Sequence, residues 1–163
     1  MPGYGLLPAG DGDGLLPWSW AEQRLEGSHN YWLATTRPDH HPHVMPLWGI
    51  WMDGSFAFST GRLSVKARNL RANPWCVVVT EDPAEPVIVE GLARLVDDTH
   101  LLRQISDAYA AKYGAAPQDP IEGPFYLLTP VRAFGLIEQA EEFARSATRW
   151  TFPGNTQPAP AHP

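Results

Sequence analysis

The stretch that decides the fold is residues 31–59, YWLATTRPDHHPHVMPLWGIWMDGSFAFS. It contains three runs rich in aromatic and β-branched residues, a composition that favours strands. These runs are residues 31–36, 44–52 and 55–59. Pro46 predicts a bulge in the second run, or a place where the strand is open to a ligand. The RPDHHP segment and the Asp53-Gly54 pair supply tight turns, so we predict an antiparallel meander.

Further strand and helix signals follow the meander. The predicted strands are residues 75–80, 87–96 and 125–138, with a last strand or docking segment at 148–152. Ser19 could cap a first short helix, with Glu22 completing a capping box. Asp97 or Asp98 could cap a later helix that ends at Tyr113 and Gly114. About six strands joined mostly by tight turns predict a mainly β protein with an antiparallel barrel.

Length and charge set the broad class. The chain has 163 residues and is acidic, with 12 Lys and Arg against 18 Asp and Glu and a formal net charge of −6. This acidity argues against general nucleic-acid binding, and no apolar run approaches the roughly 18 residues of a membrane span. The single cysteine, Cys76, lies in an apolar run and excludes an intrachain disulfide framework. Without a secretory signal, we expect a cytoplasmic protein.

One domain fits this length. We place it at residues 18–152. Residues 1–17, rich in Gly and Pro, are interpreted as a flexible arm, and residues 153–163 as a disordered tail.

A basic segment, residues 60–74 (TGRLSVKARNLRANP), stands out within this acidic chain. It holds four of the twelve cations: Arg62, Lys66, Arg68 and Arg71. No acidic residue lies between Asp53 and Glu81. If Ser64 caps a helix here, Lys66 lies in the first turn, where unpaired amides and the helix dipole attract anions.

Hydroxyl groups of Thr60 and Ser64 add donors, and Arg68 could make a forked contact with a phosphate. The segment therefore predicts a phosphate site. The alternative is a solvated amphipathic helix whose cations pair with surface acids elsewhere. The sequence has neither the GxxxxGK[ST] pattern nor a GxGxxG fingerprint after a strand.

The three histidines His40, His41 and His43 could suggest a metal site. No Cys or acidic partner for them is evident in the sequence, so we interpret them as part of an exposed turn and predict no metal.

Several of these motifs, in this order, resemble the pyridoxamine 5'-phosphate oxidase-like family of flavin-binding split β-barrels. The most specific are L-A-T-x-x-x-D-x-x-P-H, W-x-D-G, F-S-T, S-x-K-A-R-N-L-x-x-N-P and the late A-T-R-W. The S-x-K-A-R-N-L form is most similar to the flavin and deazaflavin (F420) oxidoreductases of the family. The chain has His40-His41 where relatives in the family often have Gly-Arg. It also has Pro86 where pyridoxamine 5'-phosphate oxidase itself has Gln, so we do not expect pyridoxamine-phosphate oxidase activity.

The resemblance implies a homodimer of six-stranded antiparallel split β-barrels with cofactor sites at the subunit interface. It implies that the cofactor phosphate meets Lys66 and Arg68, with Ser59, Thr60 and Ser64 nearby. Met45, Pro46, Leu47 and Trp48 would run along the ring system. Arg149 and Trp150 resemble a segment that approaches the site from the partner, and Arg62 could reach the acidic tail of F420.

Two functional hypotheses follow. The first is an oxidoreductase that uses F420, or alternatively FMN, to reduce a small planar or conjugated substrate. The second is a non-catalytic protein that binds a flavin or haem. The sequence nominates no catalytic acid or base.

Overall fold

Eight strands form one antiparallel sheet in the computed structural model, which describes residues 15–115, 123–152 and 154. The strands are β1 (Tyr31–Thr36), β2 (Pro42–Leu47), β3 (Gly49–Met52), β4 (Ser55–Ser59), β5 (Trp75–Thr80), β6 (Val87–Leu95), β7 (Phe125–Gly135) and β8 (Thr148–Thr151). The helices are α1 (Trp18–Gly27), α2 (Val65–Ala72), α3 (Thr99–Tyr113) and α4 (Ala140–Ser146). The strand order is β2-β1-β5-β6-β7-β4-β3, and β8 also pairs with β7.

This strand order requires the sheet to curl. β2 and β3 lie at opposite edges of the order, yet only Trp48 separates them along the chain. The two edges must therefore approach each other, and the sheet becomes an incompletely closed barrel. This confirms the predicted mainly β, split-barrel fold. Its strand count is eight rather than six, because β8 forms a strand and the predicted second strand is divided.

The prediction of one continuous strand over residues 44–52 is wrong, because the first half pairs with β1 and the second half with β4. The backbone groups at the break leave the sheet and are satisfied by α3. Tyr109 donates its hydroxyl to the carbonyl of Trp48 at 2.7 Å, and the amide of Gly49 donates to the hydroxyl of Tyr113 at 3.0 Å. A side chain at Gly49 would overlap the ring of Phe56, with the added Cβ only 2.0 Å from a ring carbon.

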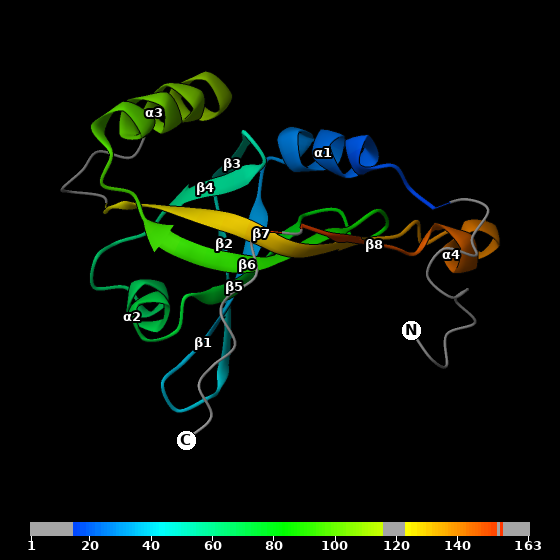
Figure 1. Cartoon of the computed structure of the whole chain (residues 1–163), viewed down its shortest axis with the longest axis horizontal. Helices are drawn as coiled ribbons and strands as arrows, with labels where there is room; N and C mark the ends of the chain where they lie inside the picture. Colours follow the sequence, from blue (N-terminus) through cyan, green and yellow to red (C-terminus); the bar gives the residue numbers. More distant parts are fainter. Residues whose placement is uncertain (1–14, 116–122, 153, 155–163) are drawn as a thin grey trace.

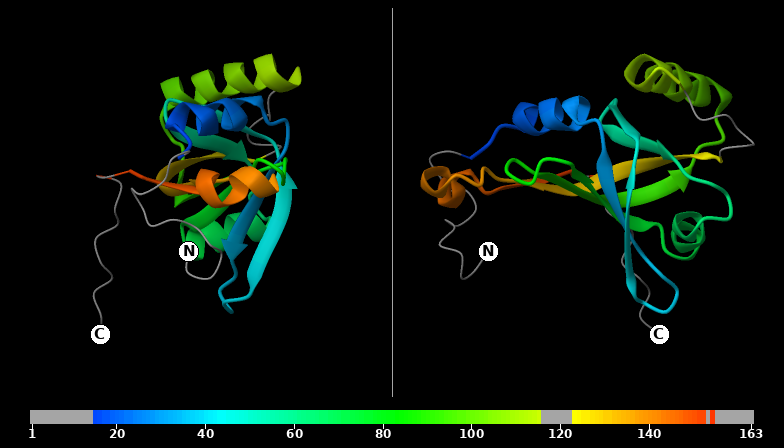
Figure 2. Two further views of the ribbon diagram at one scale, coloured as in Figure 1. Left: turned by 90° about the vertical axis from the view of Figure 1, so that its right-hand side faces the viewer. Right: turned by 180° about the vertical axis from the view of Figure 1, so that it is seen from behind.

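The main core fills the inside of the curl, and helices cover it at both ends. Ala21 and Leu25 of α1 enter the same buried cluster as Ala67 and Leu70 of α2. α1 and α2 lie on opposite sides of the sheet, and α3 lies beside α1 (Figures 1 and 2). A second cluster beneath α3 is centred on Ile105 and packs against the other faces of β3 and β4.

Gly91 marks an irregularity in the pairing of β6. The pairing of β6 with β7 shifts register between Glu90 and Gly91. A Cβ at Gly91 would lie 2.2 Å from the carbonyl oxygen of Thr129, so glycine allows the two backbones to approach closely here.

The helix ends agree with the sequence in part. Ser64 and Asp98 cap α2 and α3 as predicted, and Gly114 ends α3 in the left-handed conformation. The predicted Ser19 cap is wrong, because α1 already begins at Trp18 and has no side-chain cap. α4 was not predicted, because its seven residues show no clear apolar period.

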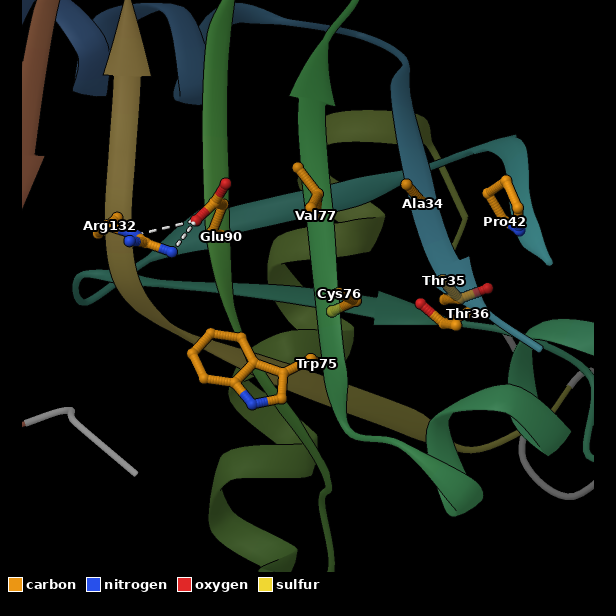
Figure 3. Close-up of a pocket in the computed structure, with 9 residues that line it drawn as sticks. All are labelled: Ala34, Thr35, Thr36, Pro42, Trp75, Cys76, Val77, Glu90 and Arg132. Atoms are coloured by element: carbon orange, nitrogen blue, oxygen red, sulfur yellow. Dashed lines mark hydrogen bonds and ion pairs between the residues drawn. The ribbon is translucent and has the colours of Figure 1, made fainter. Parts of the chain in front are cut away.

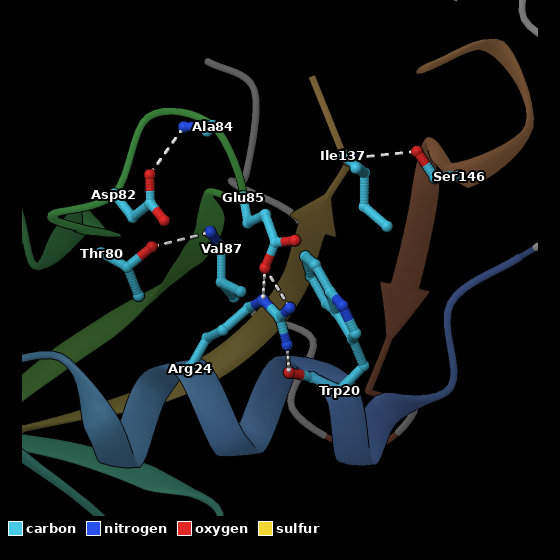
Figure 4. Close-up of polar contacts among 9 residues, drawn as sticks. All are labelled: Trp20, Arg24, Thr80, Asp82, Ala84, Glu85, Val87, Ile137 and Ser146. Carbon is cyan, nitrogen blue, oxygen red and sulfur yellow. Dashed lines mark hydrogen bonds and ion pairs between the residues drawn. The ribbon is translucent and has the colours of Figure 1, made fainter. Parts of the chain in front are cut away.

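α1 is held on the sheet by polar contacts instead of a cap. Arg24 donates from Nε to the carboxylate of Glu85 at 2.9 Å and lies 3.7 Å from the ring centroid of Trp20 (Figure 4). Glu85 belongs to the loop between β5 and β6, so this contact ties α1 to that loop.

Most of the predicted arm (residues 1–17) and tail (153–163) lies outside the described residues. Within the arm, the amide of Leu16 donates to the hydroxyl of Thr148 at 2.8 Å, which brings residue 16 against β8. Among the described residues, no helix has the length and apolar character needed to cross a membrane.

Candidate functional site

The N-terminus of α2 has the geometry expected of an anion site. The hydroxyl of Ser64 accepts a hydrogen bond from the amide of Ala67 at 3.1 Å and lies 3.0 Å from the hydroxyl of Thr60. Within the described part of the chain, the amides of Val65 and Lys66 have no acceptor. Two free amides and the helix dipole therefore converge on the space before the first turn.

Lys66 adds a half-buried positive charge to this helix end. Burial lowers the pKa of its ammonium group. In the described residues, the side chains of Lys66 and Arg68 make no hydrogen bond or ion pair. Arg71 is different, because it donates to the carbonyl of Arg62 at 3.2 Å and so braces the loop. A partly desolvated lysine without a counter-charge is an incomplete arrangement that a bound anion would complete.

α2 is fixed against the hairpin of β1 and β2 by one buried amide. Asn69 donates from Nδ2 to the hydroxyl of Thr35 at 2.9 Å, and Thr35 lies opposite His43 in the strand register. His43 therefore lies on the face that α2 covers, and burial, Arg37 and Lys66 together lower its pKa. The prediction that His43 belongs to an exposed turn is wrong, because it lies within β2 and is partly buried.

The predicted ring-binding residues line an open edge of the sheet. Among the described strands, β2 pairs only with β1. Met45 and Leu47 lie opposite Leu33 and Tyr31, on the inner face with His43, whereas Pro46 points to the outer face. The free edge of β2 leaves backbone groups available to a ligand.

Trp48 is held on a rigid aromatic support at the end of β2. Its ring is stacked on Tyr113 with 4.6 Å between centroids and 4° between planes. His29 meets Tyr113 edge-on at 5.1 Å. The indole nevertheless remains 48% exposed. The sequence predicted Trp48 as a site residue. It did not predict the stacking of Trp48 on Tyr113, because Tyr113 is 65 positions away in a different element.

Two predicted hydroxyl groups already have partners. The hydroxyl of Ser59 lies 3.1 Å from the carbonyl of Gly123 and 3.2 Å from that of Pro124. Thr60 is buried and contacts Ser64. Both residues shape the loop before α2, so Lys66, Arg68 and the amides of Val65 and Lys66 are the groups here without a partner among the described residues.

Arg149 and Trp150 are not brought to this site. They lie on β8, which with α4 projects away from α2 and the β1–β2 hairpin (Figures 1 and 2). The register gives one row across the outer face of the sheet: Pro46, Trp32, Val79, Ile88, Phe134 and Arg149. Five strand spacings of about 4.8 Å separate the ends of this row, or about 24 Å along the sheet. Trp150 packs against Trp18, with 5.4 Å between ring centroids.

The outer face of the sheet carries an open hollow of about 310 Å³ (Figure 3). Its lining includes Ala34, Pro42 and Val77, together with an ion pair in which Arg132 donates to Glu90 at 2.8 Å. A second hollow lies beside Glu85 and Glu138. Neither of these two hollows is lined by Lys66 or Arg68.

No group of three or more His, Cys, Asp or Glu side chains in the described residues is arranged to hold a metal ion. His41 instead lies 3.2 Å from the carboxylate of Asp39 in the exposed turn.

Comparisons with known structures agree with this architecture. The chain is similar to a conserved hypothetical protein from Mycobacterium tuberculosis, with a TM-score of 0.68 and 22% identity over 78% of this chain and 88% of that one. It is similar to an F420 reductase, with a TM-score of 0.56 and 27% identity over 69% and 94% of the two chains. It also resembles an FMN-binding, pyridoxamine 5'-phosphate oxidase-related protein from Nostoc punctiforme, with a TM-score of 0.55 and 20% identity over 85% and 97%.

No curated protein matches the chain. The model of the pyridoxamine 5'-phosphate oxidase family matches residues 20–133, which is more than half of the chain. The motifs, the curled sheet and this match agree, and the chain belongs to the pyridoxamine 5'-phosphate oxidase family.

Proposed function

We propose that the protein is an oxidoreductase that binds F420, with FMN as the alternative cofactor, and reduces a small planar or conjugated substrate. The observation that carries this proposal is the half-buried Lys66 at the start of α2, which has no counter-charge among the described residues. A cofactor phosphate placed here would meet an ammonium group and two free amides.

The residues present fit such a cofactor. Lys66, Arg68 and the amides of Val65 and Lys66 would hold the phosphate. The inner face of β2, with Met45 and Leu47, would lie along the rings, and the apolar surroundings would limit water. When bound, the flavin or deazaflavin supplies hydride transfer, and the chain supplies orientation and electrostatics.

F420 is favoured over FMN for two reasons. The S-x-K-A-R-N-L motif is most similar to the deazaflavin group, and a similar solved structure is an F420 reductase. In addition, Arg62, Arg68 and Arg71 provide positive charge beyond a single phosphate, which suits the longer acidic tail of F420.

We also propose a homodimer in which each site is shared between subunits. Within one chain, Arg149 lies at the far end of the sheet from β2. A partner packed against the outer face could bring its own Arg149 and Trp150 to the site.

Cofactor titration tests the phosphate site. We expect Lys66→Ala with Arg68→Ala to weaken the binding of F420 or FMN at least tenfold, because a hydrogen bond to a charged group contributes about 1.5–3 kcal/mol. Arg94→Ala with Arg103→Ala removes two exposed cations outside the basic segment and is the matched control. If both double variants bind as the unaltered protein does, the phosphate site is not at α2.

The absorption spectrum separates the cofactors. A flavin spectrum in the purified protein supports FMN, and a Soret band would support the alternative of a haem-binding protein. Colourless protein that binds F420 and oxidises its reduced form in the presence of a conjugated acceptor supports the first choice.

A further inference from the structure

The side chain of His43 carries a polar atom that the protein itself leaves unpaired. Its Nδ1 atom is fully shielded from solvent and has no hydrogen-bond partner in the described structure. No other side-chain nitrogen or oxygen that is fully buried in a non-exposed described residue lacks a partner. Leaving a buried donor or acceptor unpaired costs about 1–3 kcal/mol, so this atom calls for an explanation.

The charged groups around His43 are of one sign. Arg37 approaches from the turn before β2, and Lys66 approaches from α2; both lower the pKa of His43, in addition to the larger effect of burial. The adjacent strand offers only the hydroxyl of Thr35, which is already bonded to Asn69. Asp39, in the same turn, is engaged by His41 and not by His43.

His43 therefore belongs to a cluster of potential cations that contains no anion. It shares the inner face of β2 with Met45 and Leu47, next to the helix that carries Lys66. This is the position where the proposed cofactor would pass from its phosphate to its rings.

We propose that His43 is a third phosphate-binding residue: its ring turns toward Lys66 as the cofactor binds, which brings the shielded Nδ1 to the phosphate, and the ring becomes protonated. This inference rests on the proposed function. The phosphate site predicted from the sequence contains no histidine, the side chain whose charge ordinarily changes near neutral pH, and His43 would add one.

The expected pH dependence follows from linkage. In the free protein, Arg37, Lys66 and burial keep the ring neutral down to a lower pH than usual. A bound phosphate favours the imidazolium form, so the complex takes up protons that the free protein does not hold. Affinity therefore rises as pH falls. The gain approaches about tenfold for each unit by which binding raises the pKa, and it is complete only at pH values below the pKa of the free ring.

The test compares His43→Asn with His41→Asn. Asn keeps a polar side chain but cannot be protonated, and His41 is an exposed histidine two positions away. The dissociation constants of F420, FMN and riboflavin are measured between pH 8 and pH 6. FMN loses phosphate charge near pH 6, so the informative quantity is the difference between each variant and the unaltered protein.

We expect the unaltered protein and His41→Asn to bind F420 and FMN about threefold more tightly at pH 6, relative to His43→Asn, than at pH 8. Riboflavin, which lacks the phosphate, should show no such difference. The same pH dependence in His43→Asn as in the unaltered protein would overturn the inference.

A second measurement avoids the variant. The His43 ring is titrated by NMR in the unaltered protein, with and without saturating FMN. We expect its pKa to rise by about one unit on binding while that of His41 stays unchanged. An unchanged His43 pKa overturns the inference even if Lys66→Ala abolishes binding. If Lys66→Ala binds the cofactor as tightly as the unaltered protein does, the proposed function is overturned instead.

Discussion

Lys66 and Lys112 are both half-buried lysines, but only Lys112 is satisfied by the protein. Lys112 donates to the hydroxyl of Tyr31 at 2.7 Å and to the carbonyl of Gly49 at 3.3 Å. It joins α3 to β1 and to the start of β3. Lys66 has no such acceptors within the described residues, although it is similarly desolvated. This contrast separates a structural lysine from one placed to receive a ligand.

Lys112 should make the free energy of unfolding depend on pH in the alkaline range. Burial lowers its pKa to about 8 in the folded protein, against about 10.4 in an unfolded chain. Between these values the unfolded state binds more protons, so the free energy of unfolding gains a contribution that rises with pH. We expect Lys112→Met to lose this rise.

Urea unfolding of both proteins at pH 7.5 to 10 measures the difference. Tyr31 and Tyr109 act in the opposite direction at higher pH because burial raises their pKa values, but both proteins share them. Equal pH slopes in the two proteins would show that Lys112 does not titrate in this range.

At the residue scale, the sequence predicted the Ser64 cap and the basic helix of the candidate site, but not the position of His43. Charge contrast is visible without a structure, so Lys66 and its Ser64 cap could be found. The sequence alone could not distinguish His43 from His40 and His41. The face of the sheet to which the His43 side chain points depends on the strand register, which places it opposite Thr35. Tyr113 was predicted as a helix end, but its stacking on Trp48 depends on how α3 lies over the sheet.

At the scale of an element, the register shift in β6 depends on Gly91, which has no side chain. We expect Gly91→Ala to lower the free energy of unfolding by about 2–3 kcal/mol, because the new methyl group would overlap the carbonyl of Thr129 on β7. Denaturant unfolding monitored by tryptophan fluorescence measures the change.

Gly27→Ala is the matched control. Gly27 is the last residue of α1, and a Cβ there would meet nothing within 4 Å. Its stability should be unchanged or up to about 1 kcal/mol higher, since alanine restricts the unfolded chain. If both variants lost similar amounts of unfolding free energy, the close approach of β6 and β7 would not be the reason why position 91 requires glycine.

Local patterns predicted most elements, and long-range pairing decided the rest. The tight turn at Asp53-Gly54 has positive φ at both residues, as the dipeptide implies. The division of the apolar run 44–52 was not visible, because both halves have strand composition. It arises from the order of the sheet, which sends β2 and β3 to opposite edges.

At the scale of the whole molecule, the outer face of the sheet exposes large apolar side chains near its β2 edge. Trp32 is 46% exposed and Val44 is 51% exposed, on neighbouring strands. We expect this face to bind a second copy, so Trp32→Glu with Val44→Glu should convert a dimer into an 18.0 kDa monomer. Light scattering after size exclusion measures the mass.

Leu95→Glu controls for charge at a comparably exposed position. Leu95 is 51% exposed but lies opposite Tyr126 at the end of β6, away from the row of Trp32. A monomeric unaltered protein, or a double variant that stays dimeric, would contradict the proposed interface.

The proposed shared site requires more than a dimer. Lys66 of one subunit and Arg149 of the other must contribute to the same cofactor site. Arg149→Ala alone and Lys66→Ala alone should each weaken cofactor binding. When the two variants are mixed and allowed to exchange subunits, half of the dimers contain one chain of each kind. Each mixed dimer has one site with both residues intact and one with neither, so about a quarter of all sites should bind normally.

Cofactor titration of the mixture, compared with each variant alone, measures this recovery. Mixing Lys66→Ala with Arg68→Ala is the control, because both residues come from the same chain and every site stays defective. Recovery in the first mixture but not in the second requires a site built from two subunits. If neither mixture recovers although subunits exchange, Arg149 belongs to the sheet edge where β8 places it, and the site at α2 is formed within one chain.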